Sequence, residues 1–283
     1  MIPLAYITEW QQVVPWRDPI MVEQDLLISR VLLDLFRQDE LRQRLAFHGG
    51  TALYKLCLAP AARYSEDIDL VQITAGPIKD TVQVIHEVLD SWLSKPTYKA
   101  TQSSVRLLYR YEPEAAPDSL QRLKIEINTR EHVAQTTLVS WPFTVASRWV
   151  QGAVQITSFS LEELLATKLR ALYQRKKGRD LFDLDYAFTH AKPNESVVVD
   201  TCVAYLSAQG NRVSTKEFQA NLHAKQADRE FRDDIKPLIR DGIAFDIDDA
   251  VERIDRLLIQ HLDAAWTRSL LSPTAVRSIE SDR

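Results

Sequence analysis

Cysteine, glycine and long apolar runs are scarce in this chain of 283 residues. The two cysteines, Cys57 and Cys202, are too few for a disulfide framework or a cysteine zinc site, so redox chemistry is not expected. No apolar run reaches the roughly 18 residues of a membrane span. Met1 to Trp10 also lacks the basic and apolar segments of a signal peptide. We therefore expect a cytoplasmic protein without a membrane partner.

An excess of positive charge is also missing. The 35 Lys and Arg residues against 39 Asp and Glu residues give a net charge of -4. Nucleic-acid binding thus cannot be inferred from overall charge and would need a local basic patch. The apolar fraction of 45% and the charged fraction of 26% match an ordinary soluble globular protein, which excludes a disordered or fibrous chain.

The first half of the chain alternates between helical and strand patterns. Only seven glycines are present, and the adjacent pair Gly49-Gly50 concentrates backbone freedom in one turn. Apolar residues at helical spacing predict helices, and alternation of apolar with polar residues predicts strands. The predicted helices are Ile20 to Leu45, Thr51 to Leu58 and Pro77 to Leu93, and the predicted strands are Asp67 to Ile73, Tyr98 to Tyr111 and Leu120 to Thr129, the last two joined as a hairpin with a long loop.

The second half is predicted to be almost entirely helical. A capping box of Ser160 and Glu163 opens a helix that runs to about Lys177. Further helices are predicted over Asp180 to His190, Ser196 to Gln209, Thr215 to Lys225 and Ala250 to Ser269, and the chain after Pro273 is predicted to fray. The sequence thus predicts an α+β fold, in which a domain over 1–158 with a mixed sheet flanked by helices precedes a mostly helical domain over 159–283.

Two carboxylates and a glycine turn form the first candidate site. Asp67 and Asp69 lie two positions apart on a predicted strand, so both side chains point to one face. Such a pair can bind Mg²⁺, which often bridges carboxylates to substrate phosphates. The turn Gly49-Gly50-Thr51 precedes a helix and can offer N–H groups and a hydroxyl to those phosphates. The alternative is an edge strand with a solvated acidic face beside an ordinary turn.

A third carboxylate, Glu126, lies in Leu123-Lys-Ile-Glu-Ile-Asn128, where apolar and polar residues alternate. Glu126 can thus sit beside the aspartate pair on a neighbouring strand. Three carboxylates on adjacent strands can bind two metal ions, which activate an attacking hydroxyl and stabilise a leaving pyrophosphate. A cross-strand ion pair with an Arg or Lys is the alternative for Glu126.

Lys168 falls in the apolar stripe of the predicted helix that begins at Ser160. Its ammonium either extends to the surface or meets an anionic partner such as a triphosphate. Asp180 and Asp183 share one helical face, since they are three residues apart, and could position Lys168 or Arg175 by ion pairing.

Six basic residues against two acidic ones, between Lys168 and Asp183, form the one local basic patch that the sequence suggests. Four of its members are the candidates for binding an RNA backbone, namely Arg175, Lys176, Lys177 and Arg179. Such an interaction would be sensitive to salt. The alternative is a solvated helix end, since charge runs usually lie on a solvated face.

Four segments occur together and in a fixed order. They are His48-Gly-Gly-Thr-Ala-Leu-Tyr-Lys55, Arg63-Tyr-Ser-Glu-Asp-Ile-Asp-Leu70, Lys124-Ile-Glu-Ile127, and Lys168-x-x-Ala-Leu-x-x-Arg175 followed by Arg179-Asp-Leu-Phe-Asp-Leu184. In this combination the chain resembles the AbiEii/AbiGii (MenT-type) family of nucleotidyltransferase toxins. The resemblance implies a polymerase-β-like nucleotidyltransferase core followed by a helical C-terminal domain that contributes Lys168 and Asp183 to the site.

The resemblance also implies roles for individual residues and partners. Asp67 and Asp69 would bind Mg²⁺; Gly49, Gly50 and Thr51 would bind phosphates; Lys168 would bind the triphosphate; and Asp183, or Asp180, would complete the site. Ser65 matches a serine that can be phosphorylated in a relative, although from the sequence alone it could face a bound nucleotide or simply cap the start of the strand. The implied partners are a nucleoside triphosphate, an RNA acceptor and an antitoxin of the AbiEi type encoded upstream.

The carboxylates and Lys168 predict a metal-dependent nucleotidyltransferase, and the resemblance implies a toxin that transfers a nucleoside monophosphate from a triphosphate to RNA, with the 3′ end of transfer RNA as the expected acceptor. Translation and growth would then be inhibited. Two alternatives stay open from the sequence. One is a nucleotidyltransferase that modifies a small molecule or a protein, and the other is a nucleotide-binding regulator without turnover.

Overall fold

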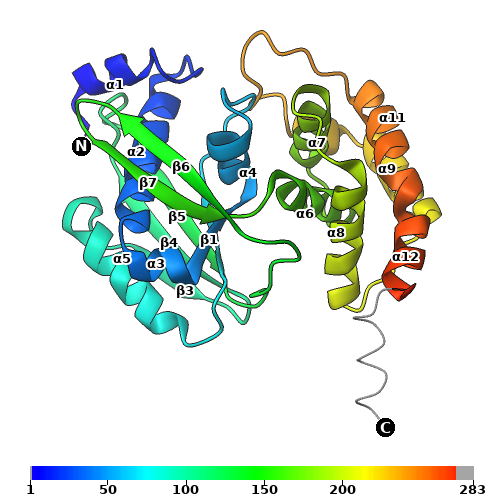
Figure 1. Ribbon diagram of the computed structural model, residues 1–283. Coiled ribbons are helices and arrows are strands. Elements are labelled where there is room, and N and C mark those ends of the chain that lie inside the picture. Colours follow the sequence, from blue (N-terminus) through cyan, green and yellow to red (C-terminus); the bar gives the residue numbers. More distant parts are fainter. Residues whose placement is uncertain (1, 272–283) are drawn as a thin grey trace. The chain divides into compact units, whose positions relative to one another are not determined.

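A computed structural model describes residues 2–271 of the chain, and the segment after Pro273 that was predicted to fray lies outside them. The contacts between Cα atoms divide the chain into two compact units, Met1–Phe159 and Ser160–Arg283. The first unit holds a sheet with helices and the second is helical (Figure 1). The predicted α+β fold, with a mixed sheet followed by a helical region, is confirmed.

The first unit is built around a sheet of seven strands in the order β3-β4-β5-β2-β1-β7-β6. The strands pair antiparallel except for β2 with β5 and β1 with β7, which are parallel. Their bounds are β1 Leu45–His48, β2 Ile68–Gln72, β3 Thr97–Ala100, β4 Ser104–Tyr111, β5 Gln121–Asn128, β6 Val139–Ala146 and β7 Gln151–Ser158. The helices of this unit are α1 Leu4–Trp10, α2 Pro19–Phe36, α3 Asp39–Arg44, α4 Gly49–Ala52, which continues as the π-helix Leu53–Cys57, and α5 Ile78–Leu93.

Alternation along β4 and β5 gives this sheet one core face. On β5, Leu123, Ile125 and Ile127 are fully buried, whereas Lys124 and Glu126 between them are partly exposed. The core face of β4 meets α5, where the Tyr109 hydroxyl donates to Asp90 at 3.3 Å. The polar residues of the same strands therefore lie on the opposite face.

The structure corrects the predicted helix from Ile20 to Leu45. Helix α2 ends at Phe36, α3 covers Asp39–Arg44, and Leu45 begins strand β1. A strand of four residues is too short to show a period in sequence, and its backbone is held by pairing with β2 and β7. The strand predicted over Tyr98 to Tyr111 is in fact two strands, β3 and β4. The four residues of β3 are likewise too few to show a period of their own. Strands β6 and β7 were not predicted.

The second unit consists of helices, as predicted. Their bounds are α6 Leu161–Gln174, α7 Gly178–His190, α8 Glu195–Ala208, α9 Thr215–Gln226, α10 Arg229–Asp233, α11 Ile247–Leu257 and α12 Leu262–Leu271, with the 3-10 turn Ile259–His261 between the last two. The helix predicted over Ala250 to Ser269 is therefore interrupted at that turn. Ser160 caps α6 by accepting from the Glu163 N–H at 3.2 Å. None of the helices within residues 2–271 combines the length and the hydropathy that crossing a bilayer requires.

Candidate functional site

The strand register places the predicted carboxylates side by side in the first unit. Asp69 on β2 is the register partner of Glu126 on β5 and of His48 at the end of β1. Glu126 in turn pairs with Arg106 on β4. Because register partners point to the same face of a sheet, these four side chains form one row across four strands. Asp67 lies two residues before Asp69 and joins the same face.

Lys124 lies within this group of carboxylates. Its Nζ is 2.9 Å from Asp67 Oδ2 and 3.3 Å from Glu126 Oε2. Burial lowers the pKa of Lys124, but its hydrogen bond with Asp67 and the charges of Asp67, Asp69 and Glu126 outweigh burial, so the net shift is upward. For Glu126, burial raises the pKa, and the ion pairs with Arg106 and Lys124 outweigh it, so the net shift is downward. The cross-strand ion pair considered for Glu126 is thus present, with Arg106 Nε at 2.8 Å.

The oxygen donors of this face suit a hard divalent cation. An ammonium already sits between Asp67 and Glu126, which shows that the face accepts positive charge. Within residues 2–271, no three His, Cys, Asp or Glu side chains are grouped so that they could hold a metal ion by themselves. A pair of carboxylates is nonetheless a sufficient protein contribution for Mg²⁺ when substrate phosphates supply further oxygens.

The glycine turn packs directly on these groups. Gly49 has φ +79°, and a Cβ there would lie 2.3 Å from Asp69 Oδ2. A Cβ on Gly50 would lie 2.6 Å from Arg63 Nη2 and 3.0 Å from Ser65 Oγ. At Gly49 both the close approach of Asp69 and the left-handed backbone disfavour a side chain, whereas a side chain at Gly50 would have to displace the ends of the Arg63 and Ser65 side chains.

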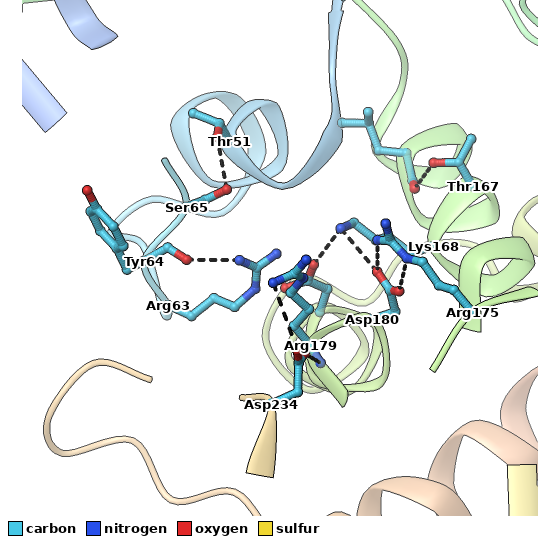
Figure 2. A network of polar contacts seen from close by, with 12 residues as sticks. Thr51, Arg63, Tyr64, Ser65, Thr167, Lys168, Arg175, Arg179, Asp180 and Asp234 are labelled. Carbon is cyan, nitrogen blue, oxygen red and sulfur yellow. Dashed lines mark hydrogen bonds and ion pairs between the residues drawn. The ribbon is translucent and has the colours of Figure 1, made fainter. Parts of the chain in front are cut away.

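Hydroxyl groups connect the turn to the strand that carries the aspartates. Thr51 Oγ1 donates to the Asp67 carbonyl oxygen at 2.5 Å and shares a hydrogen bond of 2.9 Å with Ser65 Oγ. Figure 2 shows this pair, together with Arg63, which donates to the Tyr64 carbonyl oxygen at 2.9 Å. The fifteen residues between Thr51 and Asp67 thus fold back so that the turn meets the carboxylates.

A partly buried ion pair anchors the helix that follows the turn. Lys55 Nζ lies 3.1 Å from both carboxylate oxygens of Asp25 on α2 and 3.1 Å from Ser29 Oγ. Asp25 also accepts hydrogen bonds from the indoles of Trp10 and Trp16, at 3.0 and 3.3 Å. This hub joins α1, α2 and the glycine turn, so the turn is held by tertiary contacts.

In the second unit, Lys168 on α6 is buried and paired with two aspartates of α7. Its Nζ is 2.9 Å from Asp183 Oδ2 and 3.4 Å from Asp180 Oδ1. Both carboxylates are fully buried, and the Lys168 side chain is 9% exposed. Lys168 therefore does not extend along the surface but meets anionic partners, which is the second of the two alternatives that the sequence left open.

Two further cations lie near Asp180. Arg175 donates two hydrogen bonds to the Asp180 carboxylate, from Nε at 2.7 Å and from Nη2 at 2.8 Å (Figure 2). Lys225 on α9 donates to the carbonyl oxygens of Leu172 and Tyr173 at the end of α6. Burial lowers the pKa of Lys225 to about 8, and the charge of Asp180 opposes this shift only partly.

The basic residues predicted to bind RNA are each in contact with acidic side chains of their own unit. Arg175 pairs with Asp180. Lys176 Nζ lies 3.0 Å from Asp228 and 2.9 Å from Glu230, and Lys177 Nζ lies 3.3 Å from Asp234. Arg179 lies 4.0 Å from the same Asp234. The positive charge of this patch is therefore largely matched within the protein.

Sequence reasoning assigned no site role to the cations of the first unit. Lys124 and Arg106 contact the carboxylates, and the guanidinium of the buried Arg63 lies against Gly50. The sequence already placed Lys124 on the same face of its strand as Glu126, but its contact with Asp67 was not predicted. The contact of Arg106 with Glu126 could not be predicted, because it depends on the register in which β4 pairs with β5.

Comparisons with known proteins bear on the family and the fold of the chain. The family described as "Nucleotidyl transferase AbiEii toxin, Type IV TA system" matches residues 30–257. The structure of MenT4, a nucleotidyltransferase toxin from Mycobacterium tuberculosis H37Rv, is similar with a TM-score of 0.62 and 17% identity, over 99% of this chain and 98% of that one. The structure of JHP933 from Helicobacter pylori is similar with a TM-score of 0.53 and 17% identity, over 92% and 97% of the two chains. None of the curated proteins is detectably similar in sequence.

Proposed function

Because the chain belongs to the AbiEii family of nucleotidyltransferase toxins of type IV toxin–antitoxin systems, we propose that it transfers a nucleoside monophosphate to RNA. A nucleoside triphosphate is the donor, and the 3′ end of transfer RNA is the proposed acceptor. The acceptor hydroxyl attacks the α-phosphorus, a new P–O bond forms, and the bond to the β-phosphate breaks to release pyrophosphate. The observation that carries the proposal is the row in which Asp69 and Glu126 lie in register beside Asp67.

We assign the divalent metal to Asp67 and Asp69, and propose that it is Mg²⁺. When bound, it would neutralise charge on the phosphates and favour attack by the hydroxyl. Glu126 holds Lys124 and Arg106 in place through its ion pairs. Lys124 can release Asp67 when a stronger cation binds, because its side chain is 31% exposed and keeps a second partner in Glu126.

The glycine turn is the proposed phosphate contact. Gly49 and Gly50 open α4, and the first N–H groups of a helix have no intrahelical partner. The absence of Cβ atoms lets phosphate oxygens approach this backbone closely. Ser65 lies beside the turn through its hydrogen bond with Thr51, so a phosphoryl group on Ser65 would place negative charge where we propose that the phosphates of the nucleotide bind.

In the second unit, Lys168 is the proposed triphosphate ligand. Its ammonium is oriented by Asp183 and Asp180, which fix the side chain in one position. Asp183 makes the shorter contact with Lys168 and is therefore the better assigned positioning residue. The antitoxin is proposed to be of the AbiEi type and encoded immediately upstream.

The test is a nucleotide-transfer assay with the purified protein, Mg²⁺, total cellular RNA and each of the four labelled ribonucleoside triphosphates in turn. The Asp67→Ala variant is compared with Asp118→Ala, which removes an exposed carboxylate from the loop between β4 and β5. We expect label in transfer RNA from at least one triphosphate. Asp67→Ala should reduce it at least about a thousandfold, since metal-assisted catalysis supplies several kcal/mol, and Asp118→Ala should leave it unchanged.

Three outcomes would contradict parts of the proposal. Label that persists in Asp67→Ala or in EDTA would remove the metal assignment. Label in an RNA other than transfer RNA would change the acceptor. No label in any RNA, from a protein that still binds nucleotide, would leave a small-molecule or protein acceptor or a binding role without turnover.

A further inference from the structure

A second basic surface lies on the strands beside the carboxylates. We call it the outer strand face, and its members are Lys99 on β3, Arg106 and Arg110 on β4, and Arg122 and Lys124 on β5. All five residues point away from the core. Arg106, Arg110, Arg122 and Lys124 alternate with buried residues of their own strands, and Lys99 is the register partner of Arg106. Lys99, Arg106, Arg110 and Arg122 are exposed, and Lys124 is partly exposed.

The register sets like charges directly opposite one another twice on this face. Lys99 pairs with Arg106 across β3 and β4, and Arg110 pairs with Arg122 across β4 and β5. Directly opposed like charges destabilise a sheet, because their Cβ atoms are only about 4.5–5.5 Å apart. An anionic ligand would remove this repulsion.

The positive charge of the outer strand face is only partly matched within the protein. Arg106 and Lys124 pair with Glu126 and Asp67. Among residues 2–271, no acidic side chain lies within ion-pair distance of Lys99, Arg110 or Arg122. In the basic patch of the second unit, by contrast, a single residue such as Lys176 has two acidic partners. Charge available for an external polyanion is therefore greater on the strands.

The outer strand face is also continuous with the aspartates. Lys124 contacts Asp67 directly, and Arg122 lies two residues before Lys124 on the same strand. Arg110 stands beside Arg122 on the next strand. Two residues along a strand span about 6.5–7 Å, so an acceptor held by Arg110 and Arg122 lies within a short distance of the carboxylates.

We infer that the outer strand face binds the phosphate backbone of the RNA acceptor and leads it to Asp67 and Asp69. This inference rests on the proposed function, since it names the surface that holds the acceptor. Arg110 and Arg122 contact phosphates, and their guanidinium groups suit that contact better than an ammonium, because they form paired hydrogen bonds with oxyanions.

The experiment compares the double variant Arg110→Ala/Arg122→Ala with the double variant Lys79→Ala/Lys95→Ala. The second pair removes the same charge from exposed positions outside the outer strand face. Binding of fluorescently labelled transfer RNA is measured without triphosphate over about 50–200 mM salt. We expect each arginine to account for about five- to eightfold in affinity at 0.1 M salt and for nearly one unit of the salt slope, while the lysine pair changes neither.

Two further readouts separate a binding role from a structural one. The arginine variant should unfold at the same or a higher temperature than the wild type, since it removes opposed charges. In nucleotide transfer it should raise the KM for RNA and leave kcat at saturating RNA unchanged. Loss of stability, or a reduced kcat with an unchanged KM, would overturn the inference.

The inference and the proposed function fail in different ways. If the wild type labels RNA but both double variants bind RNA equally well, the surface is wrong and the function stands. If the wild type binds no RNA, the surface is wrong whatever the acceptor proves to be. If RNA binding depends on the arginines but no RNA is ever labelled, the surface stands and the RNA-transfer function fails.

Discussion

The two units hold similar groups in opposite surroundings. On the sheet of the first unit, Lys124 lies between Asp67 and Glu126, and the side chains of these residues are 31%, 38% and 21% exposed. In the helices of the second unit, Lys168 lies between Asp180 and Asp183, which are fully buried. Each of the two clusters thus consists of a lysine between two carboxylates.

The difference in burial decides what each cluster can do. Water competes for exposed ion pairs, so the pairs of Lys124 are weak and can be exchanged for a metal ion or a substrate. Water cannot replace the partner of a buried charge. Loss of one member of a buried ion pair therefore leaves the other charge without either water or a partner, which destabilises the protein. The exposed cluster is therefore suited to chemistry, and the buried cluster is suited to holding Lys168 and Arg175 in place.

The largest predicted effect is on the buried cluster. Asp180→Ala leaves Arg175 without its carboxylate and Lys168 with Asp183 alone. We expect the free energy of unfolding to fall by about 3–5 kcal/mol, as measured by urea denaturation. Asp67→Ala serves as the comparison from the exposed cluster and should change stability far less. Equal losses in the two variants would show that burial does not distinguish the clusters.

The next prediction uses Lys225, whose pKa is lowered to about 8 by burial. In the unfolded chain a lysine titrates near pH 10.4. Between these values the unfolded state binds more protons, so this lysine makes the protein more stable as pH rises from about 8 to 10.5. The gain should approach about 3 kcal/mol and be absent from Lys225→Met. Parallel pH profiles for the two proteins would contradict the lowered pKa.

Gly49→Ala should affect both stability and activity. Its Cβ would meet Asp69 Oδ2 at 2.3 Å, and its φ of +79° is unfavourable for alanine. We expect a loss of about 1–3 kcal/mol together with lower nucleotide affinity. Gly210→Ala is the control, since Gly210 also has a positive φ but has no neighbour within 4 Å of a Cβ. If both variants lose nucleotide affinity, the close approach to Asp69 is not the cause.

The smallest predicted effect compares the two basic surfaces. Lys176→Ala/Lys177→Ala removes cations that already contact Asp228, Glu230 and Asp234. We expect RNA affinity to fall only about twofold, against five- to eightfold for each arginine of the outer strand face. The same fluorescence titration measures both. A larger loss for the lysine pair would place the RNA on the second unit.

Several features followed from local sequence because their causes are local. The alternation in β5 assigned Glu126 to the face opposite Ile125, the pair Gly49-Gly50 marked the turn, and the spacing of Asp180 and Asp183 put both on one side of α7. Each of these three features depends only on residues that lie within one or two helical turns, or within a few residues along one strand. The helical second half followed for the same reason.

Other features depended on contacts between distant segments. The row of His48, Asp69, Glu126 and Arg106 exists only because β1, β2, β5 and β4 align in one register. The four-residue strand β1 has no period of its own and is defined by its two neighbours.

The sequence by itself therefore determined which chemical groups the protein carries and which face of its own helix or strand each one occupies. The tertiary structure decided which of these charges are buried, which are paired and which are left for a ligand. The physical reason is that side-chain direction is set by the local backbone, whereas desolvation and ion pairing depend on whatever distant residue packs alongside.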